Sequence, residues 1–231
     1  MDVFEAIQKR RSIRSYIEKP VEFEKIATII EAGHLAPSAG NIQEWKFIIV
    51  TEKEKIKQVA NYCLEQYWIA SAPVLIVICC DPEKQEVNYG LRGVRLYSIQ
   101  DSACAAENML LAATGLGLGS CWVGAFDEER IKEIFNIPKN IRVQSIITIG
   151  YSNEVPTRQE RQSLESITYF NNYGMRIENI NRYLREYSLE WQRIANESKP
   201  KWNSFLNGIK KKLHMNSSNY SKIIEQKTKK K

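Results

Sequence analysis

The stretch Arg10-Arg11-Ser12-Ile13-Arg14 places three guanidinium groups and one hydroxyl group within five residues, directly after a short segment with an apolar face. A guanidinium stays charged at all ordinary pH values and presents a planar fork of donors that fits a phosphate. Adjacent arginines at the end of a helix can also simply complement its C-terminal dipole in water. The five residues alone favour this second interpretation, so the rest of the sequence has to decide.

Length and composition indicate one large domain, or one domain with an appendage, because the chain has 231 residues of which 43% are hydrophobic. The formal net charge of +6 is unevenly distributed. Residues 176–231 hold 14 Lys and Arg against 5 Asp and Glu, whereas the remaining chain holds 19 against 22. The folded core is therefore not predicted to bind nucleic acid.

The sequence predicts a cytoplasmic protein. It has no apolar run long enough to span a membrane, and Met1–Glu5 does not begin a secretory signal. The five cysteines are odd in number and lack CxxC spacing, which indicates a reducing compartment. Cys79, Cys80 and Cys104 lie in apolar runs and are predicted to pack as small hydrophobic residues. With only two histidines, no metal site is expected.

Hydrophobic periodicity predicts helices over 3–10, 21–32, 52–66, 96–118 and 127–135, and strands over 45–50, 73–80, 120–124 and 143–149. Asp2 and Glu5 form a capping box, and Gly33 is predicted to cap the second helix. The polar segment 81–95 indicates a loop or small lobe beside a site. The helix 96–118 is apolar nearly all round, which indicates burial in the core or in a subunit interface.

Two glycine-containing segments need separate interpretation. The run Gly115–Gly119 has GxGxG spacing and follows a helix, so it is not a dinucleotide-binding fingerprint. The segment 36–45 is a loop by composition, in which Gly40 permits close backbone approach and short polar side chains are available. Trp45 and Trp122 are predicted to lie in the core rather than to stack on a ligand, and Cys121 to serve packing.

Four separated stretches together resemble the nitroreductase family of flavin enzymes. They are Arg-Arg-Ser-Ile-Arg at 10–14, Ala-Pro-Ser-Ala-Gly-Asn-Ile-Gln-Glu-Trp at 36–45, Gly-Leu-Gly-Ser-Cys-Trp-Val-Gly at 117–124, and Pro-Thr-Arg-Gln-Glu-Arg-Gln-Ser-Leu-Glu at 156–165. The resemblance covers residues 1–173 and leaves 174–231 as a basic helical extension. It implies an α+β fold, with a small central mixed or antiparallel sheet flanked by helices. It also implies an obligate homodimer with two FMN molecules at the interface.

The resemblance assigns cofactor-binding roles residue by residue. Arg10, Arg11 and Ser12 would hold the FMN phosphate and ribityl oxygens, joined by Arg161. Gln159 stands where many relatives carry a basic residue, so Arg158 would substitute for it. Arg14 would reach the N1/C2 carbonyl end of the ring, where a fixed cation favours the reduced flavin. The remaining contacts fall into two sets: Pro37, Ser38, Ala39 and Asn41 from the partner chain, and the backbone of Trp122, Val123 and Gly124 near N5 and O4.

The function implied is a hydride shuttle. NADH or NADPH would reduce the flavin at N5, and a nitroaromatic, a quinone or a similar small aromatic acceptor would then take its place in a ping-pong mechanism. No nucleophile–base pair is evident, which agrees with chemistry carried by a cofactor. Three alternatives remain open: a dehalogenase of the same fold, a flavin-cleaving enzyme, and a non-catalytic flavin-binding regulatory or storage module.

The basic extension contains one apolar stripe at helical spacing, formed by Trp202, Phe205, Leu206, Ile209 and Leu213. Lysines flank this stripe, and such a helix either lies on an anionic membrane or docks on a protein. Packing on the partner subunit is the favoured interpretation, and membrane association the less favoured one.

Overall fold

The computed structural model describes residues 1–180. The chain groups into two compact units, Met1–Arg158 and Gln159–Lys231, and each is described by itself. The division at residue 173 that the sequence suggests stays a prediction. The apolar stripe at 202–213 lies outside the described residues. In the part of the chain that is described, no helix combines the length and apolar character that crossing a membrane requires.

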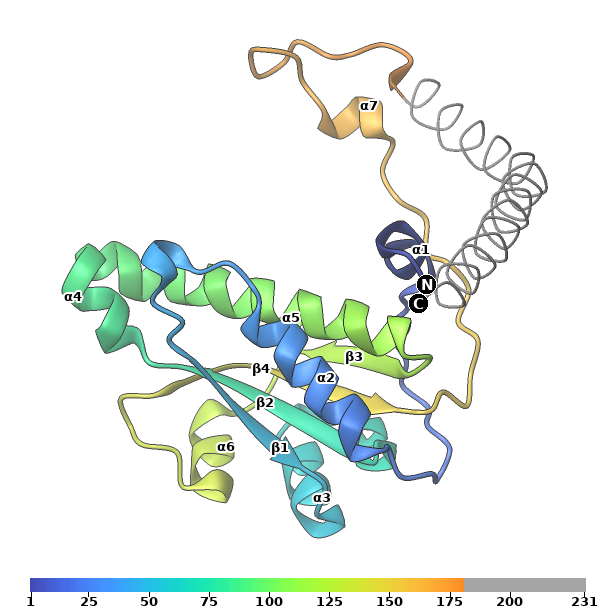
Figure 1. Ribbon diagram of the computed structural model, residues 1–231, viewed down its shortest axis with the longest axis vertical. Coiled ribbons are helices and arrows are strands. Elements are labelled where there is room, and N and C mark those ends of the chain that lie inside the picture. Colours follow the sequence, from blue (N-terminus) through green and yellow to red (C-terminus); the bar gives the residue numbers. More distant parts are fainter. Residues whose placement is uncertain (181–231) are drawn as a thin grey trace, which may run out of the picture. The chain divides into compact units, whose positions relative to one another are not determined.

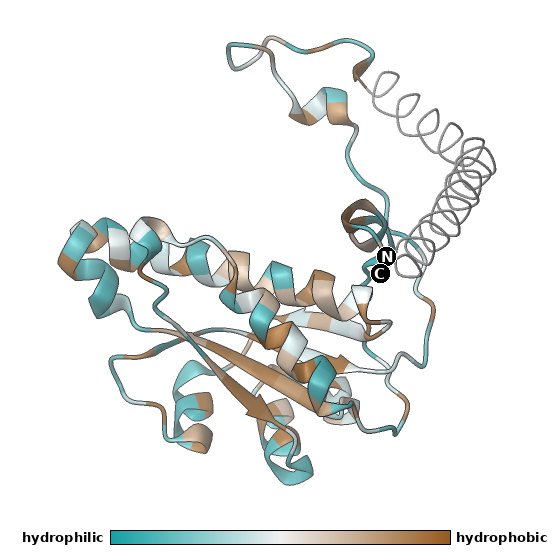
Figure 2. Cartoon of the chain, in the orientation of Figure 1, coloured by the Kyte–Doolittle hydropathy of each residue, from teal (hydrophilic) through white to brown (hydrophobic). Residues whose placement is uncertain are grey.

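The first unit is built on one four-stranded antiparallel sheet with the order β1-β2-β4-β3. The strands are β1 (Trp45–Val50), β2 (Val74–Cys80), β3 (Gly119–Val123) and β4 (Arg142–Gly150). All seven residues of β2 are buried, as its continuous apolar run predicts, and Figure 2 shows this strand as hydrophobic along its length. The predicted strands are confirmed, and of the two sheet types expected the antiparallel one is present.

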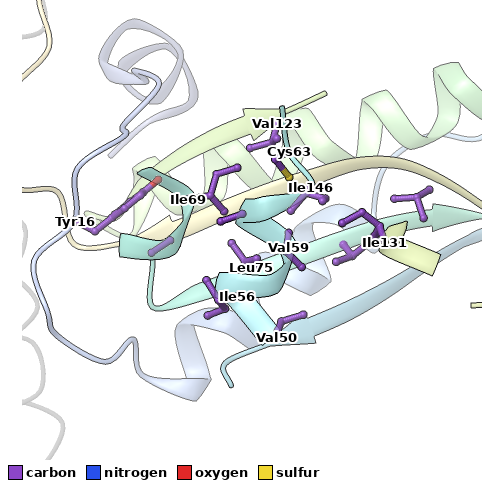
Figure 3. Close-up of a cluster of buried hydrophobic side chains, with 14 of the residues drawn as sticks. Tyr16, Val50, Ile56, Val59, Cys63, Ile69, Leu75, Val123, Ile131 and Ile146 are labelled. Carbon is purple, nitrogen blue, oxygen red and sulfur yellow. The ribbon is translucent and has the colours of Figure 1, made fainter. Parts of the chain in front are cut away.

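Helices cover both faces of the sheet (Figure 1). On one face, α2 (Phe23–His34) and α5 (Ser98–Gly115) pack over the strands, with Ile29, Met109 and Ile147 fully buried between them. On the opposite face lie α3 (Lys53–Asn61) and α6 (Glu128–Phe135). Figure 3 shows this second core, which alternate residues of β2 reach because successive strand side chains point to opposite faces.

Local signals correctly predict how two helices begin. The Asp2 side chain accepts a hydrogen bond from the Glu5 backbone N–H at 2.8 Å and starts α1 (Val3–Lys9). The Glu5 carboxylate instead pairs with Lys9, so only half of the predicted capping box forms. Asp127 caps α6 in the same way through the Arg130 N–H. These contacts need only neighbours in sequence, which is why the sequence is sufficient to predict them.

The prediction for 81–95 is wrong, because this segment forms α4 (Pro82–Arg92) and continues into a π-helical turn, η3 (Gly93–Tyr97). Pro82 stands in the first turn of α4, where its missing N–H costs nothing. The buried residue of α4 is the polar Gln85, so no apolar period marks the helix in the sequence. As a result α5 begins at Ser98 and ends at Gly115, rather than spanning 96–118.

Two further predictions about these helices are corrected. Gly33 lies inside α2 instead of capping it. A Cβ at this position would stand 2.2 Å from Met109 Cε of α5, so close packing of the two helices favours glycine there. Cys104 is exposed rather than packed, because α5 has one buried face and one open face. The open face also carries the charged Glu107.

The second unit contains α7 (Leu164–Ile167), whose N-terminus is capped by the Ser163 side chain. A bridge between Tyr169 and Arg176 closes the segment that follows. The rings of Tyr169 and Tyr173 lie 4.6 Å apart between their centroids. These local contacts are the structural features of this unit among the described residues.

A glycine at the end of β4 provides a test of the packing at this corner. A Cβ on Gly150 would lie 2.6 Å from Pro73 Cδ and 2.8 Å from Tyr16 Cδ1, two rigid ring atoms. We expect Gly150→Ala to lower the free energy of unfolding by about 1–3 kcal/mol through overpacking. The matched control is Gly115→Ala, because a Cβ added there would meet no atom within 4 Å. Urea unfolding should show the control within about 1 kcal/mol of the unaltered protein, and equal losses would contradict the packing argument.

Candidate functional site

The Arg10–Arg14 stretch leaves α1 and pairs with the free edge of β3. Ser12 forms a parallel bridge with Ser120, and the Ile13 N–H donates to the Ser120 carbonyl at 3.0 Å. A Cβ at Gly119 would stand 2.9 Å from Ile13 Cγ1, so the glycine permits this close approach. The stretch is thus held by the sheet itself through backbone hydrogen bonds.

A buried tyrosine also holds the Arg10–Arg14 stretch in place. The Tyr16 hydroxyl donates to the Ile13 carbonyl at 2.7 Å and lies 2.6 Å from Thr148 Oγ1 of β4. Burial is the main cause that raises the pKa of Tyr16 far above its usual value, so the hydroxyl keeps its proton. Since Ile13 is also buried, its carbonyl would lose its partner if this hydroxyl were absent.

Glu154 holds the other end of the stretch, and sequence reasoning missed it. Its Oε1 accepts hydrogen bonds from the backbone N–H groups of Arg14 and Ser15, the second at 3.1 Å. Hydrogen bonds to a carboxylate are charge-assisted and stronger than neutral ones. Because Glu154 lies about 140 residues away in the chain, no local pattern in the sequence connects it to the arginines.

The three arginine side chains differ in their surroundings. Arg11 Nη1 donates to the carbonyls of Gln8 and Arg10 at 2.7 and 2.8 Å, which is the helix-terminus role that the simpler interpretation assigned. Arg10 Nε lies 3.9 Å from Glu107 of α5, and the Arg14 guanidinium lies 5.8 Å from the centre of the Trp68 ring. Among the described residues neither Arg11 nor Arg14 forms an ion pair, so both charges are available to an anion.

The loop before β1 adopts a strained turn. It contains η1 (Ala39–Asn41), and Gly40, Asn41 and Gln43 have positive φ angles of 59°, 56° and 53°. Ser38 Oγ accepts a hydrogen bond from the Gln43 N–H at 3.1 Å and closes the loop. The Ala39 N–H donates to the Asp101 carboxylate of α5. Left-handed conformations at non-glycine residues cost energy and often mark functional loops.

Within one chain the structure does not bring this loop to the arginines. The loop attaches to α5 at Asp101, and the arginine stretch approaches it at Glu107, six residues further on. Six residues advance a helix by about 9 Å and turn it by about 240°. The two sets of predicted contacts therefore lie on different sides of α5, towards opposite ends of it (Figure 1).

The remaining predicted residues are distributed as follows. Trp122, Val123 and Gly124 lie at the end of β3, directly beyond the pairing with Ser12. Arg158 is an exposed residue at the end of the first unit, and Arg161 belongs to the second unit. The convergence of these two arginines with Arg10–Arg14 stays a prediction. Pro37 is exposed and leads into the loop before β1.

Predictions about aromatic and thiol side chains have mixed outcomes. Trp45 is 5% exposed and lies in the core as predicted, whereas Trp122 is 38% exposed, so its predicted place in the core is wrong. Trp122 points away from the buried face that Cys121 and Val123 occupy, because strand side chains alternate. Burial raises the pKa of the Cys121 thiol, which fits the predicted packing role. Within residues 1–180 no cluster of His, Cys, Asp and Glu is arranged to hold a metal ion.

Comparison with known proteins gives the family of this chain. The family model described as "Nitroreductase family" matches residues 7–70 and 63–151. The chain belongs to the nitroreductase family. A protein of Archaeoglobus fulgidus is 40% identical over 152 residues, covering 64% of this chain and 84% of its own length. The "FMN reductase [NAD(P)H]" of Bacillus subtilis is 28% identical over 210 residues, covering 85% of this chain and 84% of its own length.

Solved structures agree with this assignment. An "FMN-dependent Nitroreductase" from Clostridium difficile is 33% identical with a TM-score of 0.64, covering 74% of this chain and 99% of the other. An "NADPH:FMN oxidoreductase" from Vibrio harveyi, solved with NAD+, is 27% identical with a TM-score of 0.68. It covers 83% of this chain and 85% of its own. The predicted nitroreductase fold is confirmed.

The role of Glu154 can be tested without a ligand. We expect Glu154→Gln to speed amide exchange at Arg14 and Ser15 about fivefold, because losing the charge from these bonds costs about 1 kcal/mol. The matched control is Glu18→Gln, since Glu18 lies in the same segment but pairs only with Lys53 at the surface. Hydrogen–deuterium exchange on the peptide spanning 13–16 measures both variants. Equal exchange in Glu154→Gln and the unaltered protein would contradict the role.

Proposed function

We propose that this nitroreductase-family protein passes hydride from NAD(P)H through FMN to a small flat electron acceptor, in two successive half-reactions. The flavin lies against the arginine stretch of one chain and the loop 38–41 of a second. The observation that carries the proposal is the Arg10–Arg14 stretch, whose backbone is fixed by the sheet edge and in which Arg11 and Arg14 form no ion pair among the described residues. A fixed, unpaired set of guanidinium groups suits a phosphate, and FMN ends in one.

The residues present fit the cofactor. FMN and NAD(P)H are the cofactor and co-substrate of this flavin oxidoreductase, as the names of its relatives agree. Arg10, Arg11 and Ser12 would hold the phosphate and ribityl oxygens. Arg14, two residues further along the extended backbone, would place its charge about 7 Å away, towards the ring. The buried Ser120 Oγ beside Ser12 has no hydrogen-bond partner among the described residues, so it can still form a hydrogen bond with a polar group of the cofactor.

The bound flavin supplies a carrier that accepts and donates two electrons, which the protein side chains lack. Arg14 would stabilise negative charge at the N1/C2 end of the ring by its fixed charge. Trp122 offers a partly exposed indole at the end of β3, beside the predicted backbone contacts of Val123 and Gly124. These groups bind and orient, and none needs to transfer a proton for the hydride step.

A second copy of the chain completes the site in this proposal. The loop 38–41 and the arginine stretch lie on different sides of α5, which favours contacts to one flavin from two different chains. The apolar face of α1 supports the same arrangement, because Val3, Phe4 and Ile7 are 68%, 77% and 52% exposed. An apolar helix face of this kind is stable when another surface covers it. The interface of an obligate dimer provides such a surface, because it resembles a protein core divided between two chains.

The dimer is tested by its mass in solution. Size-exclusion chromatography with light scattering should give twice the mass of the 26.8 kDa chain, together with bound flavin. Phe4→Asp should shift the protein towards monomers and release the flavin, because it places a charge in the apolar contact. Leu64→Asp is the control, since Leu64 follows α3, is 68% exposed and belongs to no proposed contact. A stable monomer that retains flavin would refute the two-chain site.

The phosphate assignment is tested by comparing FMN with riboflavin, which lacks the phosphate. We expect Arg10→Gln to weaken FMN binding about 10- to 100-fold, the loss expected for a charged hydrogen bond. Riboflavin binding should be unchanged. Arg130→Gln is the control, because Arg130 pairs with Glu133 on the exposed face of α6. Equal weakening of both flavins would place Arg10 away from the phosphate, and fluorescence titration measures all four combinations.

The two half-reactions of the proposed hydride shuttle are tested one after the other. Anaerobic mixing of the purified protein with NADH or NADPH should bleach the flavin absorption band at ~450 nm. Adding a nitroaromatic, a quinone or free FMN should then restore it. Free flavin belongs in this screen because relatives carry the names FMN reductase and NADPH-flavin oxidoreductase. Absence of bleaching with both nucleotides would rule out the proposed shuttle and favour a non-catalytic flavin-binding role.

A further inference from the structure

Three segments of the first unit meet at a buried group of polar side chains that the proposed reaction does not use. Glu44, which directly precedes β1, is 0% exposed, and Asp101 of α5 is 6% exposed. Between them lies Gln85, the buried residue of α4. Its Nε2 donates to Glu44 Oε2 at 3.1 Å and to Asp101 Oδ2 at 2.7 Å. We call these three residues the carboxyl cluster.

The cluster is tied to the loop before β1 by one backbone group. The Ala39 N–H donates to both carboxylate oxygens of Asp101, each at 3.1 Å. Ala39 begins η1, the turn in which Gly40 and Asn41 have positive φ angles. A turn of this kind persists only where surrounding contacts hold it. Asp101 provides such a contact from outside the loop, whereas the Ser38–Gln43 bond acts within it.

The donors in the cluster are too few for its acceptors. Neither carboxylate forms an ion pair within residues 1–180. Glu44 Oε1 and Gln85 Oε1 have no hydrogen-bond partner there. Two neighbouring carboxylates that are buried without a cation cannot both remain ionised at low cost. One retained proton removes a charge and also adds the donor that the cluster lacks.

The hydrogen bonds indicate which carboxyl group keeps the proton. Asp101 accepts from the Ala39 N–H and from Gln85, and donors of this kind favour the ionised form. Glu44 is the more deeply buried of the two and has the orphaned oxygen. Burial is the main cause that raises the pKa of both carboxyl groups above their usual values. The assignment of the proton to Glu44 agrees with this direction.

Other titratable groups around the cluster do not supply a compensating charge. From β2, Cys80 approaches, and burial raises its pKa to about 11, so it stays neutral. The Asp81 backbone N–H donates to the Glu44 carbonyl at 3.1 Å, and the Asp81 carboxylate, whose buried Oδ1 has no partner among the described residues, adds no positive charge. From α4 comes the neutral Gln85, while the charged Lys84 and Glu86 beside it are exposed. The proton on Glu44 therefore decides the charge of the cluster.

We propose that Asp101 is a positioning residue that holds the loop 38–41 in its flavin-binding conformation, and that it does so as the ionised half of a pair whose single proton rests on Glu44. This inference depends on the proposed function, because it takes the loop to contact FMN. Loss of the proton places a second charge beside Asp101. Repulsion then separates the two carboxylates and loosens the hold on Ala39.

The direction of the pH effect follows from linkage. A carboxyl group with a raised pKa binds more protons in the folded state than in the unfolded state, so its contribution to stability falls as pH rises. The folded protein and its loop should therefore weaken on the alkaline side of the normal carboxyl range. Glu44→Gln mimics the protonated form at every pH and should remove this dependence.

The experiment measures FMN release from diluted full-length holoprotein by flavin fluorescence, between about pH 6 and about pH 9. We expect the unaltered protein to bind FMN several-fold more weakly at the alkaline end. Glu44→Gln should give a flatter profile, and Asp101→Asn should weaken FMN binding about tenfold throughout, as expected when a loop anchor worth ~1.4 kcal/mol is lost. Glu86→Gln is the control, since it makes the same chemical change at the exposed neighbour of Gln85.

Each outcome either supports the proposal or overturns it. It is overturned if Asp101→Asn binds FMN like the unaltered protein, or if Glu44→Gln keeps the alkaline weakening. A flat profile in the unaltered protein would overturn the proposed loosening of the loop at alkaline pH. If Asp101→Asn does not fold, Glu44→Gln still tests the proposal, because the neutral amide side chain at position 44 is compatible with the folded cluster. Absence of FMN binding in the unaltered protein would instead refute the proposed function.

Discussion

The free edge of β3 is the constraint on which the candidate site depends. A strand at the end of a sheet leaves backbone donors and acceptors unpaired, and proteins usually cover them. Here the cover is the Ser12–Ile13 segment, which pairs with Ser120 over Gly119. The arginines on either side of that segment are thus positioned by the sheet. Arg11 and Arg14 form no ion pair among the described residues, so their charges remain available to an anion, whereas Arg10 lies beside Glu107.

The second constraint is α5, which carries the two halves of the predicted cofactor site on different sides. Asp101 anchors the loop before β1, and Glu107 lies beside Arg10. The buried face of this helix packs on the sheet and fixes its orientation. Because this helix separates the two sets of predicted contacts, its geometry supports the proposed two-chain site, independently of the apolar face of α1.

Much of the fold could be predicted because its signals are local. The run of β-branched residues in β2, and the Asp caps of α1 and α6, depend on neighbours in sequence. The errors arise where contacts between residues far apart in the chain determine the structure. α4 has no apolar period because it buries Gln85, and Trp122 is partly exposed because β3 is short and lies at the edge. Of the site, the sequence predicted the arginines, the loop and Trp122–Gly124, whereas Glu154 and the carboxyl cluster were missed because their partners are remote in the chain.

In the proposed site, the two halves would differ in how they respond to pH, because different chemistry holds each. The arginine half uses backbone hydrogen bonds and guanidinium groups, whose charge is constant across the pH range in which proteins are folded. The loop half is anchored by a carboxyl pair without a cation, whose charge depends on one proton. A cofactor held by both would keep its phosphate contacts when the proton leaves and lose order first at the loop. In the proposed site, affinity for the phosphate and order in the loop would therefore depend on different groups, although both act on one bound molecule.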